Sequence, residues 1–144
     1  MNTKIFNFNL KKLNDFAHNF SKNLSVSDII LLQGDFGSGK TTLSRYIIKN
    51  IYFLNKLKIP KIITSPSFPI VQIYPLKNFD IYHYDFYRIN KISEILEIGF
   101  EENIKKNISL IEWPKLIMPL IKNYKKKVIK LSIIDDEHRQ LTIS

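Results

Sequence analysis

The sequence contains no cysteine and no long hydrophobic run. Without cysteine the chain can form neither a disulfide nor a thiolate metal site, and it has no cysteine nucleophile. No uncharged apolar run approaches the roughly 20 residues of a membrane-spanning helix, so we expect no membrane partner. The first residues, MNTKIFNFNLKK, lack the charged head, apolar stretch and cleavage site of a secretory signal. These absences favour a reducing compartment, and we expect a cytoplasmic location.

Glycine, proline and arginine are scarce. The 144 residues include 4 glycines and 6 prolines, too few for a flexible linker between domains. A chain of this length is typical of one domain, and we expect residues 1–144 to form a single domain. The only arginines are Arg45, Arg88 and Arg139. So few arginines leave little choice for an arginine that stabilises a transferring phosphoryl group.

Positive charge is in excess, because the sequence has 22 Lys and Arg but 13 Asp and Glu, which gives a formal charge of +9. The excess accompanies many isoleucines and asparagines, which indicates a biased composition in which lysine fills ordinary surface positions. We therefore expect no DNA binding, and at most an indirect or transient association with RNA. The lysine cluster over residues 122–130 is interpreted as a solvated turn before the last strands.

Hydrophobic periodicity predicts alternating strands and helices. Asn9 is the expected N-cap of the first helix, and Gly99 is expected to end the third, which Ser93 could cap. The expected strands cover residues 5–8, 29–32, 70–74, 81–85, 108–112, 128–133 and 140–143, and the expected helices cover residues 10–24, the glycine loop to 54, and 93–98. This alternation favours a three-layer α/β domain with a central, mostly parallel or mixed sheet.

A phosphate-binding loop lies between the second expected strand and the following helix. The segment GDFGSGKT, residues 34–41, matches G-x-x-x-x-G-K-[ST] at every position, and three of the four glycines lie in it. Glycines allow successive backbone N–H groups to turn inward at the positive end of a helix, which creates an anion-binding nest. The predicted nucleotide contacts are Gly37, Ser38, Gly39, Lys40, Thr41 and Thr42. Lys40 is expected at the β and γ phosphates, the Thr41 hydroxyl at Mg²⁺ and Thr42 at the α phosphate.

Two carboxylates at strand ends are candidates for the metal. Asp85 ends one expected strand and Glu112 ends another, and Mg²⁺ prefers such hard oxygen ligands. Glu112 is the first choice, because its strand is the more continuously apolar. His83 is interpreted as a packed strand residue, and Arg88 is expected to pair with Asp85.

Five motifs in order resemble the bacterial TsaE (YjeE) family. The segment GDFGSGKTTL resembles that family's GDLGAGKTTL loop, and SPSF, residues 65–68, resembles its SPTF. HYDFYR, residues 83–88, is similar to HxDxYR; IGFEE, residues 98–102, to LGLEE; and IEWP, residues 111–114, to VEWP. Together they span residues 34–114. One departure is Ser67, which replaces the usual threonine and loses the methyl group that restricts χ1.

The resemblance implies a Mg²⁺-dependent ATPase in the formation of threonylcarbamoyladenosine beside the anticodon of tRNAs that read ANN codons. It implies the partner proteins TsaB and TsaD, with ATP hydrolysis, weak in the isolated protein, resetting their complex between turnovers. Carried over by motif, Thr41 and Glu112 would ligate Mg²⁺, Asp85 would assist the metal or its water, and Trp113 would pack beside the nucleotide. Lys40, Asp85 and Glu112 are thus the expected catalytic residues.

Other P-loop proteins are alternatives. A GTPase normally has an NKxD segment, whereas the sequence here is Asn55-Lys56-Leu57-Lys58. A small-molecule kinase usually has a mobile lid with several arginines, and only one arginine follows residue 88. A non-catalytic nucleotide-sensing module stays open, because a P-loop indicates binding and not turnover.

Overall fold

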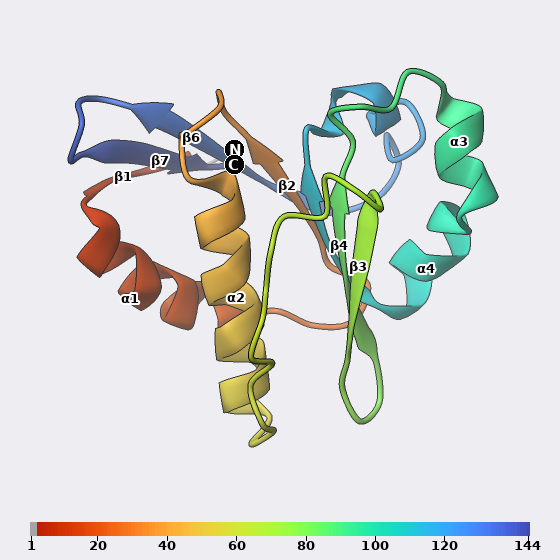
Figure 1. The fold of residues 1–144 in the computed structure, drawn as a ribbon, viewed down its shortest axis with the longest axis horizontal. Coiled ribbons are helices and arrows are strands. Elements are labelled where there is room, and N and C mark those ends of the chain that lie inside the picture. Colours follow the sequence, from red (N-terminus) through yellow and green to blue (C-terminus); the bar gives the residue numbers. More distant parts are fainter. Residues whose placement is uncertain (1–2) are drawn as a thin grey trace.

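The computed structural model describes residues 3–144, except for the side chain of Leu10. Its seven strands form one mixed sheet. Residues 1 and 2 of the expected domain lie outside the described residues. The sheet order is β1-β7-β6-β2-β5-β4-β3 (Figure 1). The strands are β1 Lys4–Phe8, β2 Ile29–Gln33, β3 Val71–Pro75, β4 Asp80–Asp85, β5 Ile108–Glu112, β6 Lys126–Ile133 and β7 Arg139–Ile143.

The four central strands β6, β2, β5 and β4 run parallel to one another, whereas β7 and β3 pair antiparallel with β6 and β4, and β1 pairs antiparallel with β7. Parallel strands need covering on both faces, and β2 and β5 are accordingly apolar over most of their length. The mixed three-layer α/β fold expected from the sequence is therefore confirmed.

Helices cover the two faces in separate groups (Figure 1). The helices are α1 Leu10–Ser21, α2 Lys40–Leu54, α3 Ile92–Glu97 and α4 Phe100–Lys106, with a 3-10 turn η1 Pro114–Ile117. On one face Leu13 and Ile47 bring α1 and α2 against Ile30 and Leu110. On the other, α3, α4 and η1 pack against the opposite side of the central strands. Two apolar cores thus enclose the sheet.

The predicted helix boundaries are partly confirmed. Asn9 caps α1 as expected, because its side chain accepts from the Lys12 backbone N–H at 3.1 Å. Ser93 is not a cap, since α3 already begins at Ile92. Gly99 does separate two helices, but it also serves as the N-cap of α4, which the sequence reading missed. Its left-handed φ of 73° lets the chain turn sharply between the two short helices.

The parallel strands β2, β5 and β4 all end at one edge of the sheet, where α2 begins. Asp85 lies opposite Glu112 in the β4–β5 register, and Leu32 lies opposite Glu112 in the β2–β5 register. The carboxyl ends of parallel strands are the usual place for a ligand in open α/β sheets. Among residues 3–144, none of the helices is long and apolar enough to cross a membrane.

Candidate functional site

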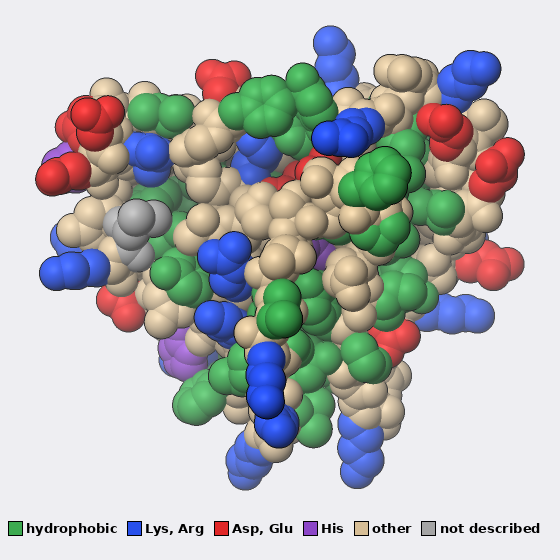
Figure 2. Space-filling model, viewed as in Figure 1, with side chains coloured by type: hydrophobic (Ala, Val, Ile, Leu, Met, Phe, Trp, Pro, Cys, Tyr) green, Lys and Arg blue, Asp and Glu red, His purple; other side chains and the backbone are tan. Residues whose placement is uncertain are grey.

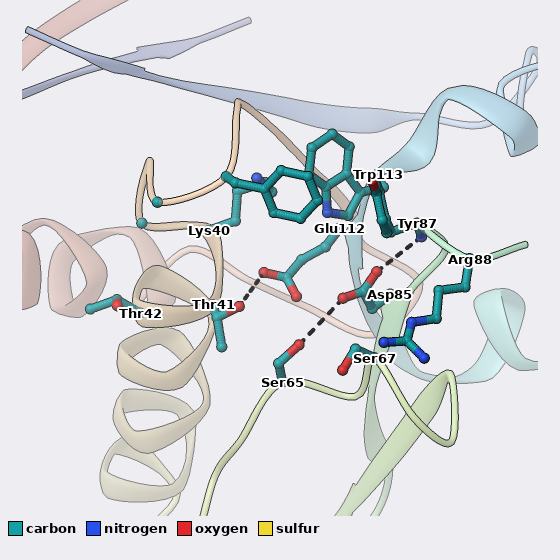
Figure 3. A pocket seen from close by; sticks show the side chains of 13 residues that line it. Lys40, Thr41, Thr42, Ser65, Ser67, Asp85, Tyr87, Arg88, Glu112 and Trp113 are labelled. Carbon is teal, nitrogen blue, oxygen red and sulfur yellow. Dashed lines mark hydrogen bonds between the residues drawn. The ribbon is translucent and has the colours of Figure 1, made fainter.

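A cavity of about 460 Å³ opens at the carboxyl edge of the sheet, above the start of α2. It is lined by the glycine loop, both strand-end carboxylates and the segment before β3 (Figure 3). Figure 2 shows hydrophobic side chains gathered around a hollow beside the start of α2, whereas lysines and arginines are scattered over this face. The predicted site residues Gly37, Gly39, Lys40, Thr41, Thr42, Asp85, Glu112 and Trp113 all line this cavity. Ser38 is buried in the loop beside it.

The glycine loop has the backbone that an anion nest requires. Gly34, Gly37 and Gly39 have φ angles of 148°, 76° and 106°, a region that other residues rarely adopt. Gly34 also has no room for a side chain, because a Cβ there would lie 2.5 Å from the Leu131 carbonyl oxygen. The Ser38 hydroxyl is buried without a hydrogen-bond partner among the described residues. The backbone angles of the loop thus fit an anion nest.

Lys40 lies folded onto its own loop. Its Nζ donates to the carbonyl oxygens of Gly34 and Asp35 at 2.6 and 2.9 Å, and it lies 4.1 Å from the centre of the Trp113 ring. Burial lowers the pKa of Lys40, while the charges of Glu112, Asp85 and Asp35 raise it and partly offset that effect. The ammonium group is thus held at the loop by weak acceptors that a phosphate oxygen can replace.

The two carboxylates have different partners, although they are neighbours in the sheet (Figure 3). Glu112 is buried, and its Oε1 accepts from the Thr41 hydroxyl at 2.8 Å. Asp85 accepts from the Tyr87 backbone N–H at 3.0 Å and from the Ser65 hydroxyl at 3.3 Å. Glu112 therefore faces the first turn of α2, and Asp85 faces the segment that contains Ser65.

These oxygens fit a magnesium ion that arrives with phosphate. Thr41 and Glu112 place a hydroxyl and a carboxylate oxygen side by side, and Glu112 Oε2 has no hydrogen bond within the described part of the chain. Residues 3–144 contain no group of three or more His, Cys, Asp or Glu that could hold a metal. Mg²⁺ is usually held by one or two protein oxygens, with phosphate oxygens and waters completing the octahedron.

Three aromatic rings lie at the mouth of the cavity. The ring centres of Phe36, Tyr87 and Trp113 are 4.7 to 5.0 Å apart. Trp113 has a left-handed backbone with φ 56°, an unusual conformation for a bulky residue that often marks functional segments. It follows Glu112 directly, so this turn brings the indole beside Lys40. That Trp113 packs beside a bound nucleotide stays a prediction.

Three polar residues make contacts that the sequence did not predict. The prediction of an Arg88–Asp85 pair is wrong, because no ion pair joins them; the Arg88 guanidinium lies 5.8 Å from the Phe68 ring. His83 is indeed packed in β4, but its Nε2 is 3.3 Å from Glu112 Oε2. Arg139 was not connected with the loop, yet its Nη2 donates to the Gly37 carbonyl at 3.2 Å. The last contact joins residues 102 positions apart, and no local pattern could have indicated it.

Two of the clustered lysines have partners within the protein. Lys126 donates to the carbonyl oxygens of Ile121 and Tyr124, and Lys127 pairs with Asp28 at 3.0 Å. Both lysines lie in β6, so the interpretation of residues 122–130 as a solvated turn is wrong from residue 126 onward, and Asp28 offsets the charge of Lys127.

A strand, a glycine loop, and a helix that begins with a buried lysine followed by two threonines define a P-loop nucleotide-binding protein. Residues 8–142 match the family model described as Threonylcarbamoyl adenosine biosynthesis protein TsaE, and the chain belongs to this family. It is 44% identical over 138 residues to the tRNA threonylcarbamoyladenosine biosynthesis protein TsaE of Rickettsia typhi, covering 92% of this chain and 88% of that one.

More distant relatives agree. The protein of the same name from Bacillus subtilis is 31% identical over 118 residues, covering 81% of this chain and 69% of that one. The crystal structure of Bacillus subtilis YdiB superposes with a TM-score of 0.71 at 22% identity, covering 99% of this chain and 84% of that one. The latter comparison supports the fold, and the former supports the family.

Proposed function

We propose that this protein binds ATP with Mg²⁺ and hydrolyses it in support of threonylcarbamoyladenosine formation on tRNA. The observation that carries the proposal is the contact between Thr41 and Glu112 at the end of the glycine loop. It pairs the two oxygen ligands that a P-loop protein uses for its metal, within the cavity that contains Lys40. The names of the relatives support the place in tRNA modification.

Each residue has a distinct part in the proposed site. The backbone N–H groups of Gly37, Ser38 and Gly39 surround the phosphates, and Thr42 donates to the α phosphate. Lys40 exchanges its two carbonyl partners for β and γ phosphate oxygens. Mg²⁺, when bound through Thr41 and Glu112, would neutralise phosphate charge.

The remaining residues act on water and on the mouth of the cavity. Asp85 is fixed by a backbone N–H and by Ser65, so it can accept a hydrogen bond from a metal-bound or attacking water. Trp113 shields the phosphate loop from one side, and the segment with Ser65 and Ser67 lies where it can respond to the γ phosphate.

The partners of the proposed reaction cycle are TsaB and TsaD. TsaD would perform the transfer of the threonylcarbamoyl group, and ATP hydrolysis on this protein would reset the TsaB–TsaD complex between turnovers. The support is the family membership, since the relatives' names place them in this biosynthesis. Contact with tRNA is proposed to be indirect or transient.

The decisive experiment measures phosphate release from ATP with and without Mg²⁺, and with and without TsaB and TsaD. We expect slow release by the protein alone, several-fold faster release with both partners, and none in the Lys40→Ala variant. Transfer of phosphate to a small molecule in place of water would instead indicate a kinase. Binding without any phosphate release, even with both partners, would indicate a nucleotide-sensing module.

A further inference from the structure

His83 is a buried polar side chain that lies close to the carboxylate of Glu112. It lies in β4 with 0% exposure, two residues before Asp85 and thus on the same face of the sheet. Its Nε2 is 3.3 Å from Glu112 Oε2, and the Glu112 side chain is 1% exposed. Neither Nδ1 nor Nε2 of His83, nor Glu112 Oε2, makes a regular hydrogen bond with the residues described.

An imidazole at this position is costly unless it has a role. Burying a polar group without a partner is unfavourable, so buried polar groups normally have one. The neighbouring positions on this face are occupied by Ile81 and Leu110, both fully buried. An apolar side chain would pack equally well there, so packing alone does not account for a histidine.

We propose that His83 is a positioning residue for Glu112. With Nε2 protonated, the imidazole donates toward Oε2 and leaves Oε1 directed at the Thr41 hydroxyl. The two atoms are 3.3 Å apart but are not aligned as a hydrogen bond, so the proposed bond requires a rotation of the imidazole or of the carboxylate. The inference rests on the proposed function, in which Glu112 and Thr41 hold Mg²⁺.

If His83 positions Glu112, its removal should affect the binding of the metal and not the binding of phosphate by the glycine loop. Partners that orient a metal-binding side chain typically change metal affinity by about 10–100-fold when they are removed. His83 is not part of the glycine loop, and it is not among the residues that line the cavity. Its loss should therefore weaken the Mg²⁺-dependent part of ATP binding and leave the Mg²⁺-free part intact.

The test compares ATP affinity with and without Mg²⁺ by titration calorimetry in three variants. His83→Leu removes the donor while keeping an apolar residue of similar size, and His83→Gln keeps an N–H group that can reach Oε2. The control is His138→Gln, which changes an exposed histidine paired with Asp135. We expect His83→Leu to lose at least 10-fold of the Mg²⁺-dependent gain, His83→Gln to recover part of it, and the control to match the wild type.

A second readout needs neither nucleotide nor metal. Imidazole ¹⁵N spectra of the ligand-free protein should show His83 protonated at Nε2, with a signal that shifts in Glu112→Gln and hardly changes in Asp85→Asn. This measurement remains available even if His83→Leu does not fold.

Two outcomes would overturn the inference. One is an unchanged Mg²⁺ gain in a folded His83→Leu protein, which would reduce His83 to a packing residue even if its melting temperature falls. The other is an imidazole protonated at Nδ1 alone. By contrast, a wild-type protein whose ATP affinity ignores Mg²⁺ would contradict the proposed metal site itself, so the two failures are distinguishable.

Discussion

The phosphate loop, residues 34–42, and the carboxylate wall, formed by Asp85 and Glu112, enclose the same cavity by different means. The loop is built from main chain, with three glycines at positive φ and a lysine bonded to loop carbonyls. The wall is built from side chains, each fixed by neighbouring hydroxyl or N–H groups. Changes in the loop should therefore affect whether nucleotide binds at all, and changes in the wall should affect the Mg²⁺-dependent part of binding and the hydrolysis that follows.

The largest expected effect is that of Lys40→Ala on ATP binding. The ammonium group would make two charge-assisted hydrogen bonds to phosphate, each contributing about 1.5–3 kcal/mol, so affinity should fall at least about 100-fold. Titration calorimetry measures this loss, and Lys49→Ala, on a later turn of α2, is the matched control. Equal affinity in the two variants would show that the loop lysine does not bind the ligand.

The wall is tested by Glu112→Gln against Asp85→Asn. Both substitutions keep the size of the side chain and remove its charge. We expect Glu112→Gln to lower Mg²⁺-dependent hydrolysis by about 100-fold and Asp85→Asn by about 10-fold, because only Glu112 touches the metal-binding hydroxyl. Phosphate release measures turnover, and calorimetry checks that both variants still bind ATP. A loss of binding as large as that of Lys40→Ala would erase the distinction between loop and wall.

A third test compares the effect on stability of replacing Gly34, in the loop, with that of replacing Gly99, which lies outside the loop. A left-handed φ costs a non-glycine residue about 1–2 kcal/mol at either site. At Gly34 a Cβ would also meet the Leu131 carbonyl and the Ser38 hydroxyl at 2.5 Å, whereas at Gly99 the nearest atom is 3.6 Å away. Gly34→Ala should thus lower the free energy of unfolding by about 3 kcal/mol, and Gly99→Ala by about 1, in urea titrations. Similar losses would mean that the backbone moves to make room at Gly34.

The smallest expected effect is a pH dependence of stability due to Lys40. Its pKa is lowered by burial in the folded protein, so between that value and its ordinary 10.5 the unfolded chain binds more protons. The free energy of unfolding of the wild type should then rise with pH in this window, relative to Lys40→Met, which lacks the group. Thermal unfolding of both proteins from pH 8 to 10.5 measures the difference. A difference that falls with pH would mean that the acidic neighbours outweigh burial.

The sequence predicted the contents of the loop and the wall but not all of their connections. The loop has a local signature, and Asp85 and Glu112 could be identified because parallel strands end at one edge. Arg88 was misassigned because the Tyr87 N–H occupies Asp85 and the turn directs the guanidinium elsewhere. Arg139 reaches Gly37 from an exposed hairpin, a contact that depends on the order of strands in the sheet and on no nearby residue.

The chain contains a single tryptophan, and its indole lies against the Lys40 ammonium group. Its intrinsic emission therefore comes from one place, the rim of the phosphate cavity. Movement of the ammonium from the ring to a polyphosphate would change the field at the indole, so the unlabelled protein should report ligand arrival optically. The same signal would follow arrival in stopped-flow mixing, before any phosphate is released.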